Sequence, residues 1–528
     1  MNAERALSFT ELPNPITSDL DRAGPAEMVD LFARCDRELF RGPRGGPPGG
    51  LLHPEVTGAL VSAVRLFRGS LPGRVVLSGA GTSGRLAFLL ARTFGERVAA
   101  AGGRVIPLIA GGDLALVKAV EEAEDDVEEA RRRAREAMAG PGKVLFVGIT
   151  CGLSAPSVGG GLLEAFRRPG TAVILVGTNR PERARPVPLD EEGTTLRDLA
   201  LRAASSPRAS LLAPLVGGEA VTGSTRLKCG SATWLLLEAL FRRGLDGTAP
   251  ADLEGAFRAD LERAEREMEA LYGQREFLAS LLERGGETLL AGGTILYAGR
   301  GEPGLAGLLD ASECPPTFGA GEDDVRAFLE GGWAALLGPG ERARRLEETW
   351  PVDLEFCRRE YVPSLGRKVL PVLLGNPPGL KEEWKASGME PEEGPEEGFF
   401  RAKLFLNLLS TGAHVRAGKV YGNRMVDVRI NNSKLFDRAL RIVEDLSGAG
   451  REEAFRALVG VIHGRDDPPR ELLEAPVAEH VRAGSAKERV VPLAVLKAAR
   501  SLSLARAGEL LRKKPILRDA LEGDRSAS

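Results

Sequence analysis

Short runs of consecutive apolar residues alternate with longer amphipathic stretches in the first half of the chain. Each run has the length of a strand that is buried on both faces of a sheet, and each amphipathic stretch has the period of a helix. This alternation indicates a parallel sheet that is covered by helices on both faces. The predicted strands span 74–78, 105–109, 144–149 and 172–176, and the predicted helices span 86–94, 114–138 and 155–166.

The same pattern begins again in the second half. An apolar run at 294–298 is followed by glycines and a helical pattern, and a further buried-strand run lies at 369–374. From about Val426 onward the pattern is helical without strand signals. We therefore predict an α/β protein with two tandem flavodoxin-like, three-layer units and a C-terminal helical cap. The expected divisions are a leader and helix at 1–55, a first unit at 56–250, a second unit at 251–425 and a helical region at 426–528.

Composition narrows the class of protein. The 528 residues include 71 Lys+Arg and 74 Asp+Glu, and the two signs are interspersed along the chain. Without a basic block we expect no nucleic-acid partner. The N-terminus carries acids and prolines where a signal peptide needs an apolar core, and no run approaches the roughly 18 apolar residues of a membrane span. We therefore expect a cytoplasmic protein that does not enter a membrane.

The cysteines do not form a recognisable framework. They are odd in number, far apart in the sequence and never arranged as CxxC. This spacing argues against structural disulfides and against a metal site, so we expect reduced thiols and no bound metal. The five are Cys35, Cys151, Cys229, Cys314 and Cys357.

A glycine-rich segment follows the first predicted strand. Residues 79–85 read Gly-Ala-Gly-Thr-Ser-Gly-Arg and match the dinucleotide-binding pattern GxGxxG. That fold needs an acidic residue at the end of the second strand, whereas this strand ends in Ala-Gly-Gly at 110–112. Thr82 and Ser83 instead place two hydroxyl groups at a helix N-terminus, which favours an anion such as phosphate. The alternative is a tight turn in which the glycines serve a steric purpose alone.

Two more hydroxyl side chains follow the third predicted strand. Thr150 and Ser154 lie past its carboxyl end, at the edge where open α/β sheets bind ligands. On local grounds Ser154 is expected to cap the next helix, because serine favours the N-cap position. Capping and ligand binding are compatible roles.

Longer strings identify a family. The chain reads GAGTSGRL at 79–86, GGEAVTGSTRLK at 217–228, DASECPPTFG at 310–319, LLSTG at 408–412 and GKVYGN at 418–423. Together these strings resemble the family of the glucokinase regulatory proteins and the N-acetylmuramic acid 6-phosphate etherases. The resemblance implies two tandem phosphosugar isomerase-type (SIS) domains that bind a phosphorylated sugar, followed by a helical cap.

The family strings are divided between the two halves. The first half keeps the phosphate loop but reads LLARTFG at 89–95, where the etherases carry a string like DASECPPTYG. The second half keeps 310–319, but its loop at 299–304 has lost the Thr-Ser pair. This complementary loss indicates a fused pseudo-dimer with one complete site.

The resemblance also implies roles for particular residues. Two glutamates, Glu124 and Glu313, match the acid and base of the etherases. Read without the family, Glu124 belongs to an acidic run at 121–129 that is typical of a solvated helix face. No cofactor is implied. The residues that would hold the sugar phosphate or shape its loop are Gly81, Thr82, Ser83, Gly84, Thr150, Ser154 and Lys419.

Two functions use the same predicted pocket. We place first a lyase that cleaves N-acetylmuramic acid 6-phosphate into N-acetylglucosamine 6-phosphate and D-lactate. The alternative is a sensor that binds fructose 6-phosphate or a similar ester and regulates a sugar kinase. The strings at 120–126 and 310–319 favour the enzyme, whereas the two-unit layout and the variant at 230–233 favour the sensor. An isomerase would need a base, but a lone histidine such as His414 is more often a packing residue.

Overall fold

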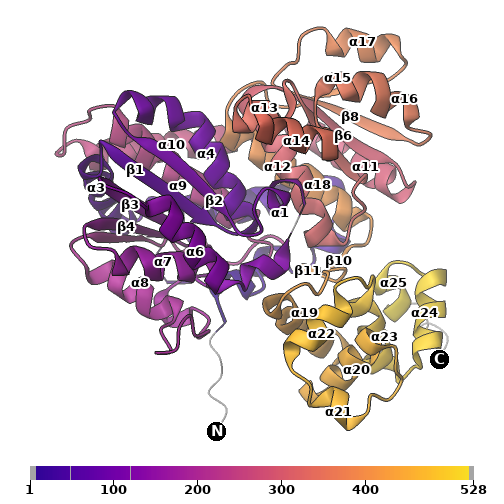
Figure 1. Ribbon diagram of the computed structural model, residues 1–528. Coiled ribbons are helices and arrows are strands. Elements are labelled where there is room, and N and C mark those ends of the chain that lie inside the picture. The colour runs from indigo at the N-terminus through magenta and orange to yellow at the C-terminus, as the bar shows by residue number, and fades with distance from the viewer. Residues whose placement is uncertain (1–6, 48, 119, 523–528) are drawn as a thin grey trace.

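The computed structural model describes residues 7–47, 49–118 and 120–522. Two parallel sheets, each with its own helices, and a separate group of helices make up this part of the chain (Figure 1). A short antiparallel ribbon joins the second unit to the last helices; its strands are β10 (Val420–Tyr421) and β11 (Arg424–Met425). Within the described ranges, no helix combines the length and apolar character needed to span a bilayer.

The first sheet has the parallel strand order β2-β1-β3-β4-β5. In the interior strand β1, Val75 and Leu77 pack in the core that includes helices α3, α4 and α9, whereas Val76 packs with α6, α7 and α8. This period of two produces three layers. The strands are β1 (Gly73–Gly79), β2 (Arg104–Ile109), β3 (Lys143–Ile149), β4 (Thr171–Val176) and β5 (Ala209–Leu212), and the helices are α3 (Pro54–Gly69), α4 (Gly81–Ala100), α5 (Leu114–Val117), α6 (Val127–Met138), α7 (Pro156–Arg167), α8 (Leu196–Ser205) and α9 (Lys228–Leu245).

The second sheet repeats this design with the parallel order β7-β6-β8-β9. Ile295 and Tyr297 of β6 face the larger core, and Leu296 and Ala298 face a smaller one on the other side of the sheet. The strands are β6 (Thr294–Gly299), β7 (Val325–Leu329), β8 (Val369–Leu374) and β9 (Glu392–Glu393), and the helices are α11 (Arg275–Leu290), α12 (Gly301–Phe318), α13 (Gly332–Leu337), α14 (Glu341–Thr349), α15 (Leu354–Phe356), α16 (Val362–Ser364), α17 (Leu380–Ala386) and α18 (Phe399–Arg416).

Helices before and between the two units connect them, and within the described residues seven helices follow the second unit. The last of these meets the N-terminal segment, where Arg518 lies 2.6 Å from Asp21 and Arg22 lies 2.9 Å from Glu522. The connecting helices are α1 (Pro25–Asp36), α2 (Glu38–Arg41) and α10 (Leu253–Tyr272), and the C-terminal helices are α19 (Ser433–Ser447), α20 (Arg451–His463), α21 (Arg470–Leu473), α22 (Val477–Gly484), α23 (Val490–Arg500), α24 (Leu504–Lys513) and α25 (Leu517–Glu522).

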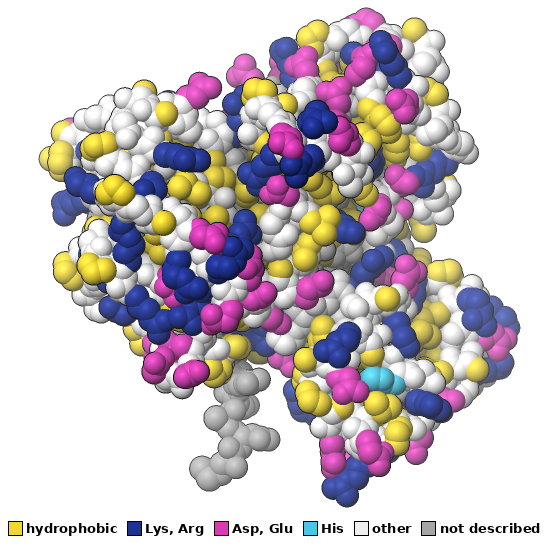
Figure 2. All heavy atoms as spheres, in the orientation of Figure 1, with side chains coloured by type: hydrophobic (Ala, Val, Ile, Leu, Met, Phe, Trp, Pro, Cys, Tyr) yellow, Lys and Arg dark blue, Asp and Glu magenta, His cyan; other side chains and the backbone are white. Residues whose placement is uncertain are grey.

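The predicted fold class is confirmed: two parallel α/β units precede a helical region. The predicted helix at 114–138 is wrong at its centre, because the chain forms α5, a 3-10 turn at Glu121–Glu124 and then α6, whose first turn is capped by Asp126. Strands β5, β7, β9, β10 and β11 were not predicted. The domain boundaries at 55, 250 and 425 stay predictions. Acidic and basic side chains are intermixed over the visible face (Figure 2).

Candidate functional site

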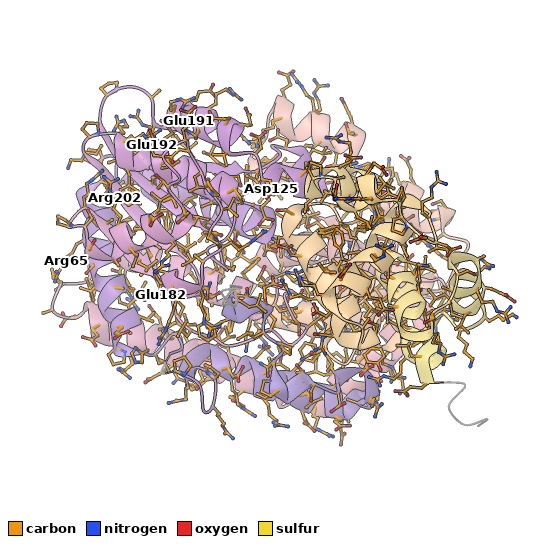
Figure 3. The ribbon with its side chains drawn as sticks, turned by 90° about the horizontal axis from the view of Figure 1, so that it is seen from below. Arg65, Asp125, Glu182, Glu191, Glu192 and Arg202 are labelled. Atoms are coloured by element: carbon orange, nitrogen blue, oxygen red, sulfur yellow. The ribbon has the colours of Figure 1, made fainter. Side chains whose placement is uncertain are left out.

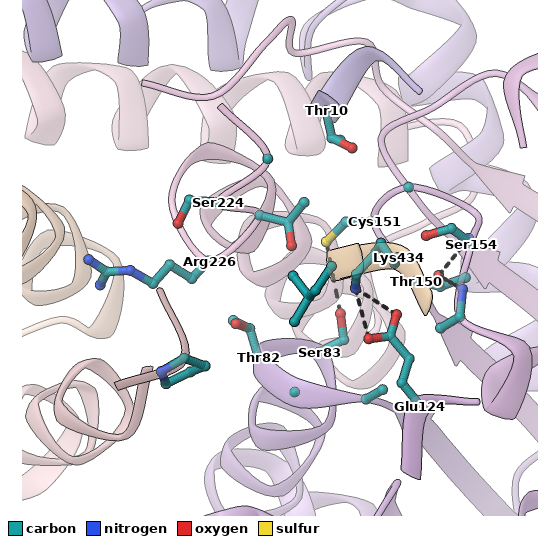
Figure 4. A pocket seen from close by; sticks show the side chains of 18 of the residues that line it. Thr10, Thr82, Ser83, Glu124, Thr150, Cys151, Ser154, Ser224, Arg226 and Lys434 are labelled. Carbon is teal, nitrogen blue, oxygen red and sulfur yellow. Dashed lines mark hydrogen bonds and ion pairs between the residues drawn. The ribbon is translucent and has the colours of Figure 1, made fainter. Parts of the chain in front are cut away.

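A polar pocket lies at the carboxyl ends of β1 and β3 (Figure 4). These strands are neighbours in the sheet, and the connection from β1 runs to β2 on one side before the chain returns to β3 on the other. Such a switch point is where open α/β sheets bind ligands. The pocket walls come from the N-terminal segment, both α/β units and helix α19.

The glycine-rich loop after β1 forms one wall. Helix α4 begins at Gly81, whose φ of +51° is in the region that favours glycine. A Cβ at Gly84 would lie 2.4 Å from Cγ1 of Ile109, so this position must also be glycine for the helix to approach β2. Thr82 and Ser83 occupy the first turn and line the pocket. The helix N-terminus and its hydroxyl groups therefore face the same space.

The loop after β3 forms the opposite wall. The Thr150 Oγ1 atom accepts hydrogen bonds from the backbone N–H groups of Ser154 at 3.2 Å and Ala155 at 3.3 Å. The local expectation that Ser154 caps α7 is wrong, because the N-cap is Ala155 and no side chain caps this helix. Ser154 lines the pocket instead. Thr150 and Ser154 thus present hydroxyl groups across from the α4 N-terminus.

Glu313 reaches this pocket from helix α12 of the second unit. Its carboxylate accepts a 2.6 Å hydrogen bond from the Thr82 hydroxyl and forms an ion pair with Arg85, and both charged side chains are buried. The complementary division of the family strings therefore has a direct spatial counterpart. One unit supplies the loop and the other supplies Glu313.

Glu124 lies in the same pocket, half-buried rather than on a solvated helix face. Both of its carboxylate oxygens lie 2.8 Å from Nζ of Lys434, which belongs to α19 (Figure 4). The adjacent Asp125 accepts a 3.2 Å hydrogen bond from the Ser433 hydroxyl; it lies where the first unit faces the C-terminal helices (Figure 3). The acidic turn therefore holds the start of α19 against the pocket.

The N-terminal segment completes the pocket with Thr10 and Glu11. Glu11 lies 2.5 Å from Arg438 and 2.8 Å from Arg441, both on α19. Burial raises the pKa of Glu11, but the two guanidinium groups outweigh it and bring this pKa down to about 2. Backbone bonds, including one of 3.0 Å from Gly223 N to Thr10 O, tie this segment to the first unit.

Two other polar residues singled out in the sequence lie away from the pocket lining. Lys419 forms a 2.9 Å ion pair with Asp427, so its role in phosphate binding stays a prediction. His414 is buried and stacks on Phe318 at 4.3 Å, and its Nδ1 lies 2.6 Å from the Ser410 carbonyl oxygen. Burial lowers its pKa to about 3, so the ring is neutral and packed.

Sequence reasoning missed several pocket residues. Nothing local in the sequence distinguishes Lys434 from Lys419 as the pocket cation. Arg226 lines the pocket while its guanidinium lies 2.6 Å from Asp310 of the second unit. No local sequence pattern marks Thr10 and Glu11 as pocket residues, because only the tertiary fold brings the N-terminal segment to the pocket.

Family models match three parts of the chain. Residues 59–166 match the glucokinase regulatory protein N-terminal SIS domain, and residues 272–342 match the second SIS domain of that protein. Residues 422–521 match its C-terminal lid domain. These matches confirm the predicted SIS units and give the C-terminal helices the name lid.

Full-length and partial relatives differ in kind. The chain is 29% identical to glucokinase regulatory protein of Xenopus laevis and 30% identical to that of Homo sapiens, with 98% of this chain covered in both cases and 93% and 92% of the relatives. N-acetylmuramic acid 6-phosphate etherase of Clostridium botulinum (strain Loch Maree / Type A3) is 36% identical, but over only 36% of this chain and 72% of the enzyme. The regulatory likeness thus extends through the lid, whereas the etherase likeness does not span the chain.

Proposed function

Because the chain belongs to the glucokinase regulatory protein family, we propose that it is a sensor of a phosphorylated sugar that regulates a sugar kinase. The sequence alone placed the lyase first. The full-length relatives favour the sensor, and the geometry of the pocket provides a physical argument in the same direction.

The phosphate group is assigned to the space between the two loops. Ser83, Thr150 and Ser154 supply hydroxyl groups there, and the α4 N-terminus adds backbone N–H groups and the positive end of its dipole. Lys434 supplies a positive charge from the lid. Gly81 and Gly84 allow the close approach of the loop. Fructose 6-phosphate is the ligand that we propose to test first.

We favour the sensor over the lyase because the carboxylates of both glutamates already contact other protein side chains. In a lyase, Glu124 and Glu313 would exchange protons with the sugar, which requires each carboxylate to reach the reacting atoms. Here Glu124 is paired with Lys434 through both oxygens, and Glu313 is held by Thr82 and Arg85. Glu313 would have to leave Arg85 before it reacts, and breaking that buried ion pair is costly.

The same contacts give the sensor a route from sugar to partner. Lys434 and Arg438 line the pocket, and both belong to the first turns of α19 in the lid. A sugar phosphate that takes over the charge of Lys434 competes with Glu124 for it. Ligand binding therefore changes how the lid is held on the first SIS unit, and a kinase that contacts the lid would sense that change.

Two assays test this proposal. Calorimetry with fructose 6-phosphate should give one site per chain, because the loop of the second unit lacks the Thr-Ser pair. Purified glucokinase should lose activity when the protein is added, and fructose 6-phosphate should change the extent of this loss. Release of D-lactate from N-acetylmuramic acid 6-phosphate would overturn the proposal in favour of the lyase.

A further inference from the structure

One of the five cysteines differs from the others in its position. Cys151 lines the sugar-phosphate pocket, in the loop that follows β3. All five side chains are buried, but the other four do not line this pocket. A small reagent that enters the pocket therefore reaches the Cys151 thiol first.

Polar groups surround this thiol. Its Sγ atom lies 3.9 Å from Oγ of Ser83 (Figure 4). It also lies 3.8 Å from Oγ1 of Thr233. A second cysteine, Cys229 at the start of α9, is close enough to influence its titration. Thr178 contacts both residues, with Oγ1 at 3.1 Å from the Cys151 carbonyl oxygen and 3.0 Å from Sγ of Cys229. Thr178 thus links the two residues, with Cys151 at the pocket wall and Cys229 outside the pocket lining.

These surroundings favour the thiolate form of Cys151. Hydrogen bonds from Cys229, and then from Thr233 and Ser83, lower the pKa of the Cys151 thiol although burial opposes them. Burial raises the pKa of Cys35, Cys229, Cys314 and Cys357 instead. The thiolate is the nucleophilic form, so reactivity follows this difference.

We propose that Cys151 is an oxidation site for hydroperoxides, that it reacts while the pocket is empty, and that Cys229 then closes a disulfide with it. In the first step the Cys151 thiolate attacks hydrogen peroxide: an S–O bond forms, the O–O bond breaks, and hydroxide leaves and takes up a proton to give water. In the second step the Cys229 sulfur attacks the sulfenic acid, an S–S bond forms, and water leaves with the Cys229 proton. The peroxide is reduced by two electrons, and the two thiols supply them.

Oxidation and sugar binding should exclude one another, a consequence that rests on the proposed function. The Ser83 hydroxyl is assigned to the phosphate group and is also a neighbour of the thiol. A bound phosphate would bring negative charge beside the sulfur, which disfavours the thiolate, and it would fill the path by which peroxide enters. Conversely, a disulfide would remove the Cys151 and Cys229 thiols and shift the loop that carries Thr150 and Ser154.

The test is peptide mapping by mass spectrometry after brief exposure of the purified protein to hydrogen peroxide. Since about one pKa unit changes the thiolate fraction about tenfold, we expect Cys151 to be oxidised at least about tenfold faster than Cys357, in a disulfide with Cys229. In Cys229→Ser, Cys151 should instead accumulate sulfenic acid that dimedone traps. Cys357→Ser, which also leaves four thiols, is the matched control and should react like the parent.

Each outcome bears on a separate part of the proposal. Oxidation of Cys151 no faster than that of Cys357 overturns it, and a disulfide that omits Cys229 overturns the resolving role. Calorimetry with fructose 6-phosphate shows independently whether sugar binds. If the sugar binds but does not slow the oxidation, mutual exclusion is wrong. If it does not bind, the proposed function fails, while the rate of the sugar-free reaction still decides the role of Cys151.

Discussion

Replacing Lys434 by methionine tests whether this lysine, rather than Lys419, binds the sugar phosphate in the pocket. Lys434 and Lys419 are closely matched: each side chain is 24% exposed, and their ammonium groups lie 2.8 Å and 2.9 Å from a carboxylate. Only Lys434 lines the pocket. Methionine keeps the apolar stem of either side chain and removes the charge, so Lys419→Met is a control of the same chemistry.

The expected loss of sugar-phosphate affinity in Lys434→Met is that of one charge-assisted hydrogen bond. Such bonds contribute about 1.5–3 kcal/mol, and we take the lower end because Lys434 is partly exposed and screened. We therefore expect the Kd for fructose 6-phosphate to rise about tenfold in Lys434→Met. Lys419→Met should leave it within about twofold of the parent. The effect should shrink as the salt concentration is raised, because screening weakens the contribution of the charge.

Isothermal titration calorimetry of both variants and of the parent at low and high salt measures these differences. Thermal melting of the same samples shows whether a variant has lost its fold. Unchanged affinity in folded Lys434→Met, or a larger loss in Lys419→Met than in Lys434→Met, would refute the assignment. In Lys434→Met the remaining Glu124 repels the phosphate, so adding Glu124→Gln should recover part of the affinity.

Three further predictions concern other contacts of the pocket. Ser83→Ala should weaken sugar-phosphate binding by roughly 1.5–3 kcal/mol in calorimetry while the melting temperature stays close to that of the parent, since glycines and backbone already shape the loop. Glu313→Leu leaves Arg85 buried without its carboxylate, so urea denaturation should show a loss of about 3 kcal/mol, and Glu313→Gln should lose less because the amide still accepts a hydrogen bond. Glu11 has a folded pKa of about 2 against an ordinary 4.5, so its contribution to the free energy of unfolding is present above pH 4.5 and is lost as the pH falls toward 2. Glu11→Gln should therefore lower the free energy of unfolding by up to about 3 kcal/mol at neutral pH. The stability of this variant should also depend less on pH in the acid range.

The strands that sequence reasoning found have an uninterrupted apolar run at their centre. Strands β1 and β3 are buried on both faces, so their hydrophobic runs are unbroken. Strand β7 was missed because Arg326 interrupts its run. In the folded protein this guanidinium lies 4.3 Å from the Trp350 ring, a contact that no local pattern reveals.

The site was predictable where two motifs depend on each other. Glu313 was assigned to the pocket because each half of the chain had lost the string that the other kept. Glu124 looked solvated because its neighbours are acidic, and its partner Lys434 is 310 positions further along the chain. The preference for Lys434 over Lys419 likewise depends on how the lid docks, which is a property of tertiary packing.

The ion pair between Glu11 and Arg438 joins positions that are 427 residues apart, and it closes the pocket. During synthesis the first SIS unit emerges early and is able to fold as N-terminal domains generally do. Its pocket nevertheless lacks a wall until α19 has left the ribosome. A chain that stops early would carry the loop and its hydroxyl groups but neither Lys434 nor Arg438. If the proposed function holds, sugar binding is therefore acquired late in translation, once α19 has emerged, and a chain that stops before α19 should bind the sugar more weakly than the finished protein.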